Sequence, residues 1–370
     1  MPQKSTMMSR CVVFAGGGTG GHLFPGIAVA RELVRRYPGM HVVFAGTGQG
    51  METRIVPREG FVFEPIRSAG LMGKSVLEIA RALFLVPVTL VDTARVIRRH
   101  RPDLVIGLGG YSAGPVVLMA ACHGTPTMLM EQNAMPGVTN RLLARVVRAA
   151  AVSYDVTCPY FGSKAVVSGN PVREGFFAER PESPAVPRRV LVIGGSQGAH
   201  IINVAMVEAA PILARESPAI RVTHQTGIRD VNFVRTGYLA AGLEARVHPF
   251  LDAMDEEMRA ADVVVCRAGA TTLAEVSAVG LPAIVVPLPH ATNDHQRRNA
   301  MLLADAGAAE VVDQSGLGGR ELAVRLMALV GNADRRRAMS VAVRQLARPD
   351  ASRIVVDRAE NLIGLVANAG

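Results

Sequence analysis

The sequence contains no tryptophan, and aromatic residues make up only 4% of its 370 residues. Proteins that bind single-stranded nucleic acid stack the bases on aromatic side chains, so this scarcity argues against a nucleic-acid partner. The four cysteines (Cys11, Cys122, Cys158 and Cys266) are scattered, form no CxxC pair and have no histidine cluster near them at metal-ligand spacing. We therefore expect neither a disulfide framework nor a bound metal.

Long apolar runs are also lacking. No segment reaches the roughly 18 uninterrupted apolar residues that a membrane-spanning helix needs. The short apolar run at residues 12–15 leads directly into glycines, so we expect no signal peptide. Hydrophobic residues make up 49% and charged residues 19%, which is too apolar for a disordered chain. These features predict a soluble or peripheral protein of the cytoplasm, with two domains for this length.

The net charge of +9 lies entirely in the first half of the chain. Residues 1–165 hold 18 Lys and Arg against 9 Asp and Glu, whereas residues 166–370 hold 22 of each. A basic half indicates an acidic substrate, an anionic membrane surface or a nucleic acid, and the low aromatic content disfavours the last. An arginine-rich proteome would explain the same charge without any partner.

Two stretches of the sequence repeat one pattern. "VVFAGGGTGGH", which ends at His22, and "VLVIGGSQGAH", which ends at His200, align without a gap. Each predicts a strand, a glycine-rich turn and the start of a helix. Strands and helices alternate along both halves, which predicts an α/β fold with doubly wound parallel sheets. We expect two Rossmann-like domains that face an interdomain cleft, over residues 1–165 and 166–350, with a linker at about 175–189 and a C-terminal helix over 351–370.

The first glycine loop, residues 16–21, satisfies the GxGxxG pattern of dinucleotide sites. Such a site also needs an acidic residue at the end of the second strand, and none occurs before Glu52. A phosphate-binding P-loop would need lysine after Gly21, where His22 stands. The loop can still bring N–H groups of a helix N-terminus to an anionic or polar ligand.

The second loop, "GGSQG", satisfies the GxSxG pattern of α/β-hydrolases. In that interpretation Ser196 is the nucleophile, with Asp262 or Glu275 as the acid and His290 or His295 as the base. The alternative is that Ser196 and the flanking N–H groups bind a phosphate at a helix N-terminus. The hydrolase interpretation leaves the matching first loop without a function, which favours phosphate binding.

A third region, residues 267–300, contains a glycine turn after a strand and then a helix that carries Glu275. A carboxylate near the start of a helix that opens onto a cleft suits two hydrogen bonds from a ribose diol. The alternative is that Glu275 stabilises the N-terminus of its own helix.

Seven motifs occur in order: "GGGTGGHLFPGIAVA", "GLGGYSAGP", "EQNAMPG", "GNPVR", "GGSQGA", "CRAGATTLAEV" and "DHQRRNA". Together, from about residue 12 to residue 309, they closely resemble the MurG family of bacterial transferases. The resemblance implies a GT-B fold and an inverting transfer of N-acetylglucosamine from UDP-N-acetylglucosamine to the C4 hydroxyl of undecaprenyl-pyrophosphoryl-N-acetylmuramoyl-pentapeptide (lipid I), which gives lipid II. It also implies a role in peptidoglycan synthesis, cell shape and cell division, at the cytoplasmic face of the bacterial inner membrane.

The same resemblance implies the donor-binding residues: Thr19, Gly20, Gly21, Asn133, Arg173, Ser196, Leu251, Ala270, Thr271, Thr272, Leu273, Ala274, Glu275 and Gln296, with Asn299 as an additional contact. In this assignment the second half binds the nucleotide, with Glu275 on the ribose hydroxyls, and the first half binds the acceptor. Metal-dependent sugar transferases commonly use a DxD acid pair, which the sequence lacks. We therefore expect no cofactor or metal, and stabilisation of the departing pyrophosphate by helix N-termini and Arg173.

The acceptor hydroxyl needs a base, and we predict that His22, directly after the first glycine turn, takes its proton. The alternative is that His22 only hydrogen-bonds its own loop; His200, at the matching place, is predicted to be structural. For the membrane we predict a patch of Ile79, Leu83, Phe84, Leu90, Arg95 and Arg98, unless its apolar side is simply core. Two other functions stay open: a GT-B transferase for a glycolipid or antibiotic aglycone, and a non-catalytic nucleotide-sugar binder.

Overall fold

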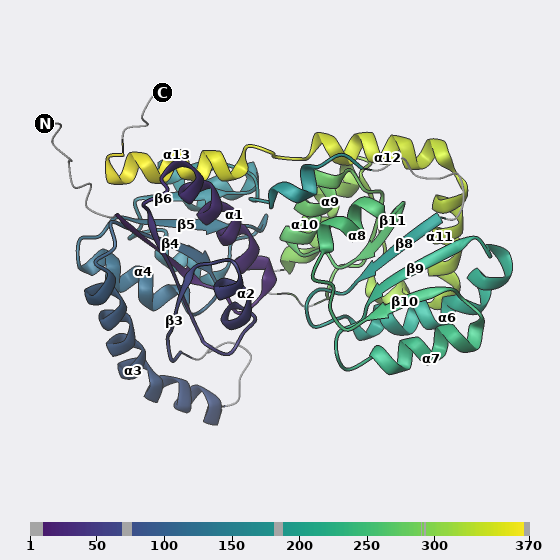
Figure 1. The fold of residues 1–370 in the computed structure, drawn as a ribbon, viewed down its shortest axis with the longest axis horizontal. Helices are drawn as coiled ribbons and strands as arrows, with labels where there is room; N and C mark the ends of the chain where they lie inside the picture. The colour runs from purple at the N-terminus through teal and green to yellow at the C-terminus, as the bar shows by residue number, and fades with distance from the viewer. Residues whose placement is uncertain (1–9, 69–75, 181–187, 290, 292–293, 366–370) are drawn as a thin grey trace, which may run out of the picture. The chain divides into compact units, whose positions relative to one another are not determined.

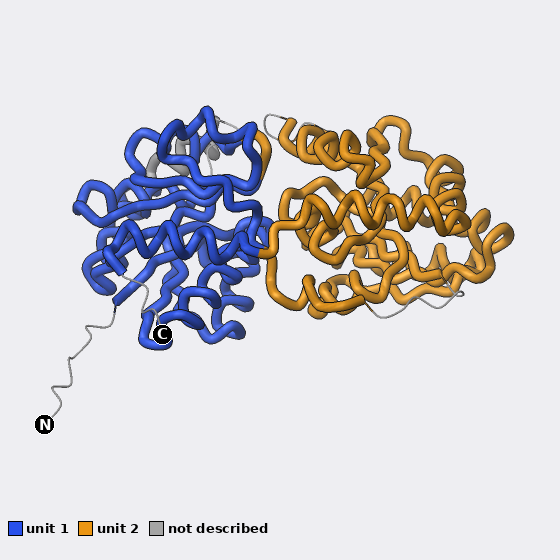
Figure 2. The backbone as a smooth tube through the Cα atoms, turned by 90° about the horizontal axis from the view of Figure 1, so that it is seen from above, with its two compact units in different colours: residues 1–132, 136–171, 350–370 blue, residues 133–135, 172–349 orange. Residues whose placement is uncertain are grey.

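The fold is that of a computed structural model, which describes residues 10–68, 76–180, 188–289, 291 and 294–365, without the side chains of residues 76–84. The chain forms two compact units (Figure 2). Unit 1 comprises residues 1–132, 136–171 and 350–370, and unit 2 comprises residues 133–135 and 172–349. The predicted boundary at residue 165 thus differs by a few residues from the division between the units.

Unit 1 is built on a seven-stranded parallel sheet with the order β3-β2-β1-β4-β5-β6-β7 (Figure 1). Alternate residues of β1 contribute to two hydrophobic cores, since Val12 and Phe14 pack in one and Val13 and Ala15 in the other. Both faces of the sheet are therefore covered, as parallel sheets require. The strands are β1 (Cys11–Gly16), β2 (His41–Gly46), β3 (Val62–Pro65), β4 (Leu104–Gly109), β5 (Thr127–Glu131), β6 (Ala149–Val152) and β7 (Ala165–Val167).

The helices of unit 1 are α1 (Gly20–Arg36), α2 (Glu52–Arg58), α3 (Val76–His100), α4 (Ala113–Cys122), α5 (Val138–Leu143) and α13 (Ala351–Ile363), with short 3-10 turns η1 (Asp155–Tyr160) and η2 (Gly162–Lys164). The sequence predicts a helix that is bent or broken at Pro87. The structure has α3 continue through Pro87 as one element, so the helix is not broken there. No helix among the described residues is long and apolar enough to cross a membrane.

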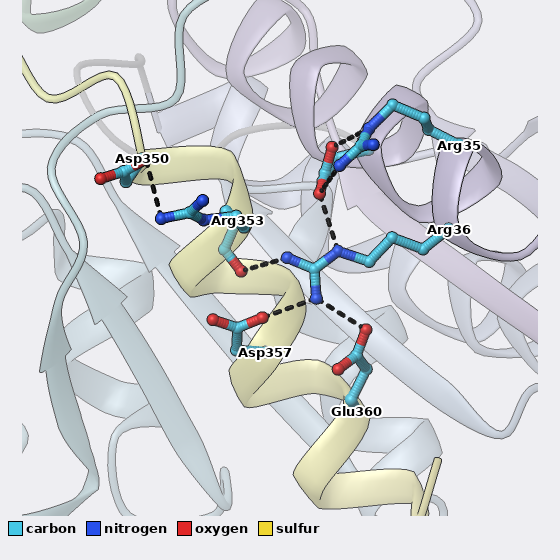
Figure 3. Close-up of polar contacts among 7 residues, drawn as sticks. Arg35, Arg36, Asp350, Arg353, Asp357 and Glu360 are labelled. Atoms are coloured by element: carbon cyan, nitrogen blue, oxygen red, sulfur yellow. Dashed lines mark hydrogen bonds and ion pairs between the residues drawn. The ribbon is translucent and has the colours of Figure 1, made fainter. Parts of the chain in front are cut away.

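The C-terminal helix α13 packs on α1 within unit 1 (Figure 1). Arg36 of α1 joins the two helices, because its guanidinium donates to Asp357 at 2.6 Å and to Glu360 at 2.9 Å (Figure 3). The same side chain also donates to Glu32 of its own helix and to the carbonyl of Arg353. The chain therefore returns to its first unit after completing the second.

Unit 2 is built on a six-stranded parallel sheet with the order β10-β9-β8-β11-β12-β13. Its strands are β8 (Arg188–Ile193), β9 (Ile220–Gln225), β10 (Ala245–His248), β11 (Val263–Cys266), β12 (Ala283–Val285) and β13 (Ala309–Val311). Its helices are α6 (His200–Glu216), α7 (Val231–Ala241), α8 (Met254–Ala260), α9 (Ala270–Val279), α10 (His295–Asp305), α11 (Gly319–Gly331) and α12 (Ala333–Gln345), with 3-10 turns η3 (Glu174–Phe177) and η5 (Gln314–Gly316).

The prediction of two doubly wound parallel sheets is confirmed. In each sheet the strand order reverses beside the first strand, between β1 and β4 in unit 1 and between β8 and β11 in unit 2. Ligands of open α/β sheets bind at the carboxyl ends of the strands at this reversal. Both glycine loops directly follow these first strands, so each unit presents its loop at the expected place.

Candidate functional site

The backbone of the first glycine loop adopts a conformation that favours glycine. Gly16, Gly17 and Gly18 have φ angles of +119°, +146° and +83°, which side chains with a Cβ rarely adopt. Glu52 is buried and holds this loop, since one carboxylate oxygen accepts from the Gly18 N–H at 3.0 Å and the other from the Thr47 hydroxyl at 2.9 Å. Its carboxylate is used within the protein, which disfavours a dinucleotide site that relies on it.

His22, the predicted base, is the third residue of α1 and is half-buried. Its Nδ1 lies 3.3 Å from Thr19 Oγ1. Its ring lies against Gly109 at the end of β4, where a Cβ would be only 2.8 Å from Cδ2 and 3.0 Å from Nε2 of the ring. Glycine at position 109 therefore leaves room for the imidazole. When Nδ1–H donates to Thr19, Nε2 is the nitrogen that can accept a proton.

Gln132 lies beside His22 and was not singled out by sequence reasoning. It follows β5, is only 3% exposed, and donates through Nε2 to the carbonyl of Leu108 at 3.1 Å. Its Oε1 has no hydrogen-bond partner among the described residues, and it lies 3.8 Å from the point where a Gly109 Cβ would be. A buried acceptor without a partner is uncommon and suits a ligand hydroxyl. The available signal was a polar residue directly after a buried strand.

The second glycine loop, which carries Ser196, is fixed from the neighbouring strand of unit 2. Gln225 at the end of β9 donates to the Gly195 carbonyl at 2.9 Å, and its Oε1 accepts from the Leu251 N–H at 2.9 Å. Gly198 packs directly against the backbone of Thr226, where no side chain would fit. The loop therefore leads into α6 with a defined backbone, as a phosphate site at a helix N-terminus requires.

The hydrolase alternative finds little support in this geometry. Asp262 precedes β11 and accepts from the N–H of Arg189 at the start of β8, whereas Ser196 follows the end of β8. The four strand residues 190–193 lie between Arg189 and the loop that carries Ser196, a distance of roughly 13 Å along the strand. Within the described part of the chain no histidine hydrogen-bonds to Ser196; His290 lies outside it.

A buried network ties the start of α6 to the sheet. His224 of β9 donates through Nε2 to Asn203 Oδ1 at 3.0 Å, and its Nδ1 accepts from the Tyr238 hydroxyl at 2.6 Å. The amide nitrogen of Asn203 donates to Asp230, which also bonds to His200 at 2.9 Å. Burial lowers the pKa of His224 to about 3, so the ring stays neutral at ordinary pH. His200 thus takes part in the network that positions α6.

We expect this histidine to make unit 2 sensitive to acid. Below about pH 6.5 His224 is protonated in the unfolded chain but stays neutral in the folded protein. The free energy of unfolding therefore falls as the pH drops toward 3. The contribution is about 1.4 kcal/mol per pH unit. Urea unfolding at several pH values between 4 and 7 gives the slope of the free energy of unfolding against pH. This slope should be smaller by this amount in His224→Gln than in the parent. Exposed His123→Gln should keep the parent slope; equal slopes in all three proteins would contradict the assignment.

Glu275, the predicted ribose ligand, is the sixth residue of α9 and is 8% exposed. The described residues give its carboxylate no hydrogen-bond donor. Burial raises its pKa to about 7, although the nearby Arg173 guanidinium acts in the opposite direction and Asp255 adds to the rise. Because Glu275 lies beyond the first turn of its helix, the helix N-terminus stabilises it little. The site is therefore a buried acceptor that lacks a partner and lies near a cation.

The other residues predicted around Glu275 differ in what they can offer a ligand. Thr272 and Ala274 are half-buried, whereas Leu273 and Leu251 pack in a hydrophobic core of unit 2. Donor contacts at these two leucines stay a prediction. The Leu251 N–H is already bonded to Gln225.

Asn133 and Asn299 lie together in unit 2, although 166 residues separate them in the sequence. The sequence predicts a donor contact at Asn299, but its side chain is 0% exposed. Its Oδ1 accepts from the Ala134 N–H at 3.0 Å, and its Nδ2 donates to Asn133 Oδ1 at 3.2 Å and to the Ala268 carbonyl at 3.3 Å. Asn299 thus holds Asn133 in place, and its contact with the donor stays a prediction. Gln296 is half-buried, and its Oε1 accepts from the Leu288 N–H.

The predicted membrane patch lies on α3, whose side chains the structure describes from residue 85 onward. The side chains of Ile79, Leu83 and Phe84 lie outside the described residues. Leu90 is 40% exposed, beside exposed Val86 and Val91. Arg95 and Arg98 are exposed, and Arg95 pairs with Asp92 at 3.3 Å. This stretch of α3 therefore presents apolar and basic side chains to solvent.

The comparisons with known proteins cover most of the chain. Residues 12–152 match the glycosyltransferase family 28 N-terminal domain, and residues 189–354 match the C-terminal domain of the same family. A protein of Anaeromyxobacter dehalogenans (strain 2CP-1) named UDP-N-acetylglucosamine--N-acetylmuramyl-(pentapeptide) pyrophosphoryl-undecaprenol N-acetylglucosamine transferase is 48% identical over 269 residues, which are 72% of this chain and 70% of the relative. A Myxococcus xanthus protein of the same name is 45% identical over the same fractions.

A solved structure agrees with these sequence relatives. MurG of Acinetobacter baumannii is 33% identical and superimposes with a TM-score of 0.74 over 95% of this chain and 99% of that one. The chain therefore belongs to the MurG family of glycosyltransferases.

Proposed function

We propose that this chain transfers N-acetylglucosamine from UDP-N-acetylglucosamine to the C4 hydroxyl of the muramoyl sugar of lipid I, giving lipid II and UDP. The named activity of relatives that are 45–48% identical supports this reaction. The single observation that carries it is Glu275, a buried carboxylate to which no described residue donates a hydrogen bond, at the sheet edge where α/β proteins bind nucleotides.

Unit 2 supplies the donor site in this proposal. Glu275 accepts hydrogen bonds from the two ribose hydroxyls. These hydroxyls take the place of the water molecules that would donate to an exposed carboxylate. The N-terminus of α6, with the Ser196 loop, faces the pyrophosphate, because helix N-termini stabilise negative charge. Arg173 adds a full positive charge close to Glu275. These groups stabilise the charge that develops on UDP as its bond to the sugar breaks.

Unit 1 supplies the acceptor site. His22 Nε2 takes the proton of the C4 hydroxyl while its oxygen bonds to the anomeric carbon, and UDP leaves with the electron pair of the broken bond. Attack from the face opposite to UDP inverts the configuration. We place Gln132 here as well, because its unused Oε1 beside His22 can accept a hydrogen bond from the acceptor.

The test is release of UDP from UDP-N-acetylglucosamine, measured with and without lipid I. We expect release to depend on lipid I and to be accompanied by formation of lipid II. Release that requires a different glycolipid or an aglycone would identify another GT-B transferase. Donor binding without release in the presence of any acceptor would indicate a nucleotide-sugar binding protein.

Ser196 is expected to act without becoming a nucleophile. Ser196→Ala should keep measurable turnover with a raised donor KM, because it removes one hydrogen bond to a phosphate, about 0.5–3 kcal/mol. An active-site serine reagent should leave the parent enzyme active. Stoichiometric labelling of Ser196 would overturn this assignment and restore the hydrolase alternative.

We propose that the chain works at the cytoplasmic face of the inner membrane, held by α3. Basic side chains near an anionic surface contribute roughly 1 kcal/mol each, and exposed apolar groups add to this. The full chain should sediment with anionic vesicles more than with neutral ones, and Leu90→Ser and Arg98→Ala should weaken this binding. The matched control is Leu239→Ser, an exposed leucine of α7. Equal binding to both vesicle types, or a similar loss in the control, would contradict the proposal.

A further inference from the structure

Cys11, His41 and His100 meet at the amino-terminal edge of the sheet of unit 1. Cys11 begins β1, His41 begins β2 directly opposite it in the strand register, and His100 ends α3. Their potential ligand atoms all lie within 4.8 Å of one another. The glycine loops follow the other ends of the strands, so this cluster is separate from the proposed transferase site. The sequence did not reveal it, because the three residues come from distant segments.

The surroundings of the two histidines favour metal binding. His100 Nε2 lies 2.8 Å from Glu64 Oε1 of β3, so Nδ1 is the ring nitrogen that can bind a metal. Metal-binding histidines almost always donate their second ring N–H to a carboxylate or carbonyl, which fixes the ring and raises its basicity. The rings of His41 and His100 are stacked, with centroids 5.6 Å apart. Both imidazoles are therefore held close together.

The cysteine is also held in place. Cys11 is 4% exposed, and its N–H donates to Asp103 at 2.8 Å. Burial and the Asp103 charge raise the pKa of the Cys11 thiol to about 12, so without a metal the sulfur keeps its proton. A metal that binds there must displace this proton into solvent. His41 also lines a groove of about 530 Å³, together with Arg31, Glu59 and Phe61.

We propose that Cys11, His41 and His100 bind one Zn²⁺ ion, with water as the remaining ligand. A thiolate with two imidazoles selects a soft or borderline cation over Mg²⁺ or Ca²⁺. Zinc bonds of about 2.0–2.3 Å place neighbouring ligand atoms roughly 3.5 Å apart, so the three side chains must close on the ion by small rotations. The ion joins β1, β2 and the end of α3, and thereby stabilises unit 1.

Metal titration of the full chain, first stripped with a chelator, tests this proposal. We expect one equivalent of Co²⁺ to produce a cobalt–thiolate charge-transfer absorption that Zn²⁺ abolishes by displacement. Zn²⁺ should also raise the melting temperature, because it binds the folded state alone. Cys11→Ala should lose the absorption and the temperature shift, whereas Cys122→Ser, which removes an exposed thiol, should keep both.

Two further variants keep the test decisive if Cys11→Ala does not fold. His41→Gln, at a half-buried position, removes one ligand and should abolish binding at micromolar zinc. Glu64→Gln keeps all three ligands and should weaken zinc binding by about 10–100-fold. Absence of stoichiometric binding to the parent chain would overturn the proposal. So would zinc affinity that His41→Gln and Cys11→Ala leave unchanged, or loss of binding in Cys122→Ser.

Discussion

His22→Ala should lower kcat by about 10²–10⁴ while the donor KM stays nearly unchanged, because removal of a general base costs this much in rate. The structure places the imidazole at the strand-order reversal of unit 1, with Nδ1 near Thr19 and Nε2 near Gly109. A sugar hydroxyl is a poor nucleophile until its proton is removed, so the loss should fall on the chemical step. Steady-state kinetics at saturating donor and lipid I measure it.

Three controls separate a catalytic from a structural role of His22. His22→Gln should lose as much activity as His22→Ala, since an amide cannot take the proton. The fall of kcat at acidic pH that comes from protonation of the base should disappear in both variants. His123→Ala, an exposed histidine after α4, should keep the parent kcat. If His22→Ala keeps kcat within a few-fold of the parent, another group takes the proton.

Glu275→Gln should raise the donor KM steeply and, without donor, raise the melting temperature above pH 7. Two hydrogen bonds from ribose hydroxyls to a carboxylate contribute on the order of 2–4 kcal/mol, which corresponds to a rise in KM of roughly 30–1000-fold. The buried carboxylate itself costs stability when it is charged, because its pKa is raised to about 7 from an ordinary value of 4.5. Folding thus favours the protonated acid.

The pH dependence gives the sign of the stability change. Below about pH 4.5 the carboxyl is protonated in both folded and unfolded chains, so glutamate and glutamine should differ little. Between about pH 4.5 and 7 the unfolded chain releases this proton while the folded protein keeps it, so the parent loses stability as the pH rises, on the order of 3 kcal/mol relative to the variant by pH 7.

Thermal melts at pH 5 and 8, with donor KM at pH 8, provide the measurement. Glu256→Gln, at an exposed position of α8, should change neither quantity. A lower melting temperature with an unchanged donor KM would mean that Glu275 stabilises its own helix and does not bind the donor. Loss of donor affinity together with a raised melting temperature is the pattern expected of a binding carboxylate kept at a cost in stability.

Much of the fold could be predicted from local sequence. Short β-branched segments alternate along the chain with segments whose apolar residues have helical spacing. Strands and helices can be told apart in this way because their apolar residues differ in period, and their alternation indicates parallel α/β sheets. The two matched glycine stretches mark the first strand of each sheet, where φ angles such as that of Gly17 exclude most side chains. The ordered motifs indicated the family and, with it, Glu275 as the ribose ligand, whereas His22 was predicted from its place directly after the first glycine turn.

The sequence by itself thus determined the fold class, the positions of both glycine loops and the family. Only the tertiary structure decided which distant residues meet: Asn133 with Asn299, and Cys11 with His41 and His100. It also showed that Gln132 Oε1 has no hydrogen-bond partner in the part of the chain that the structure describes, and that Glu275 is buried near Arg173. The physical reason is that local periodicity decides helix and strand, whereas strand order and register decide proximity and burial.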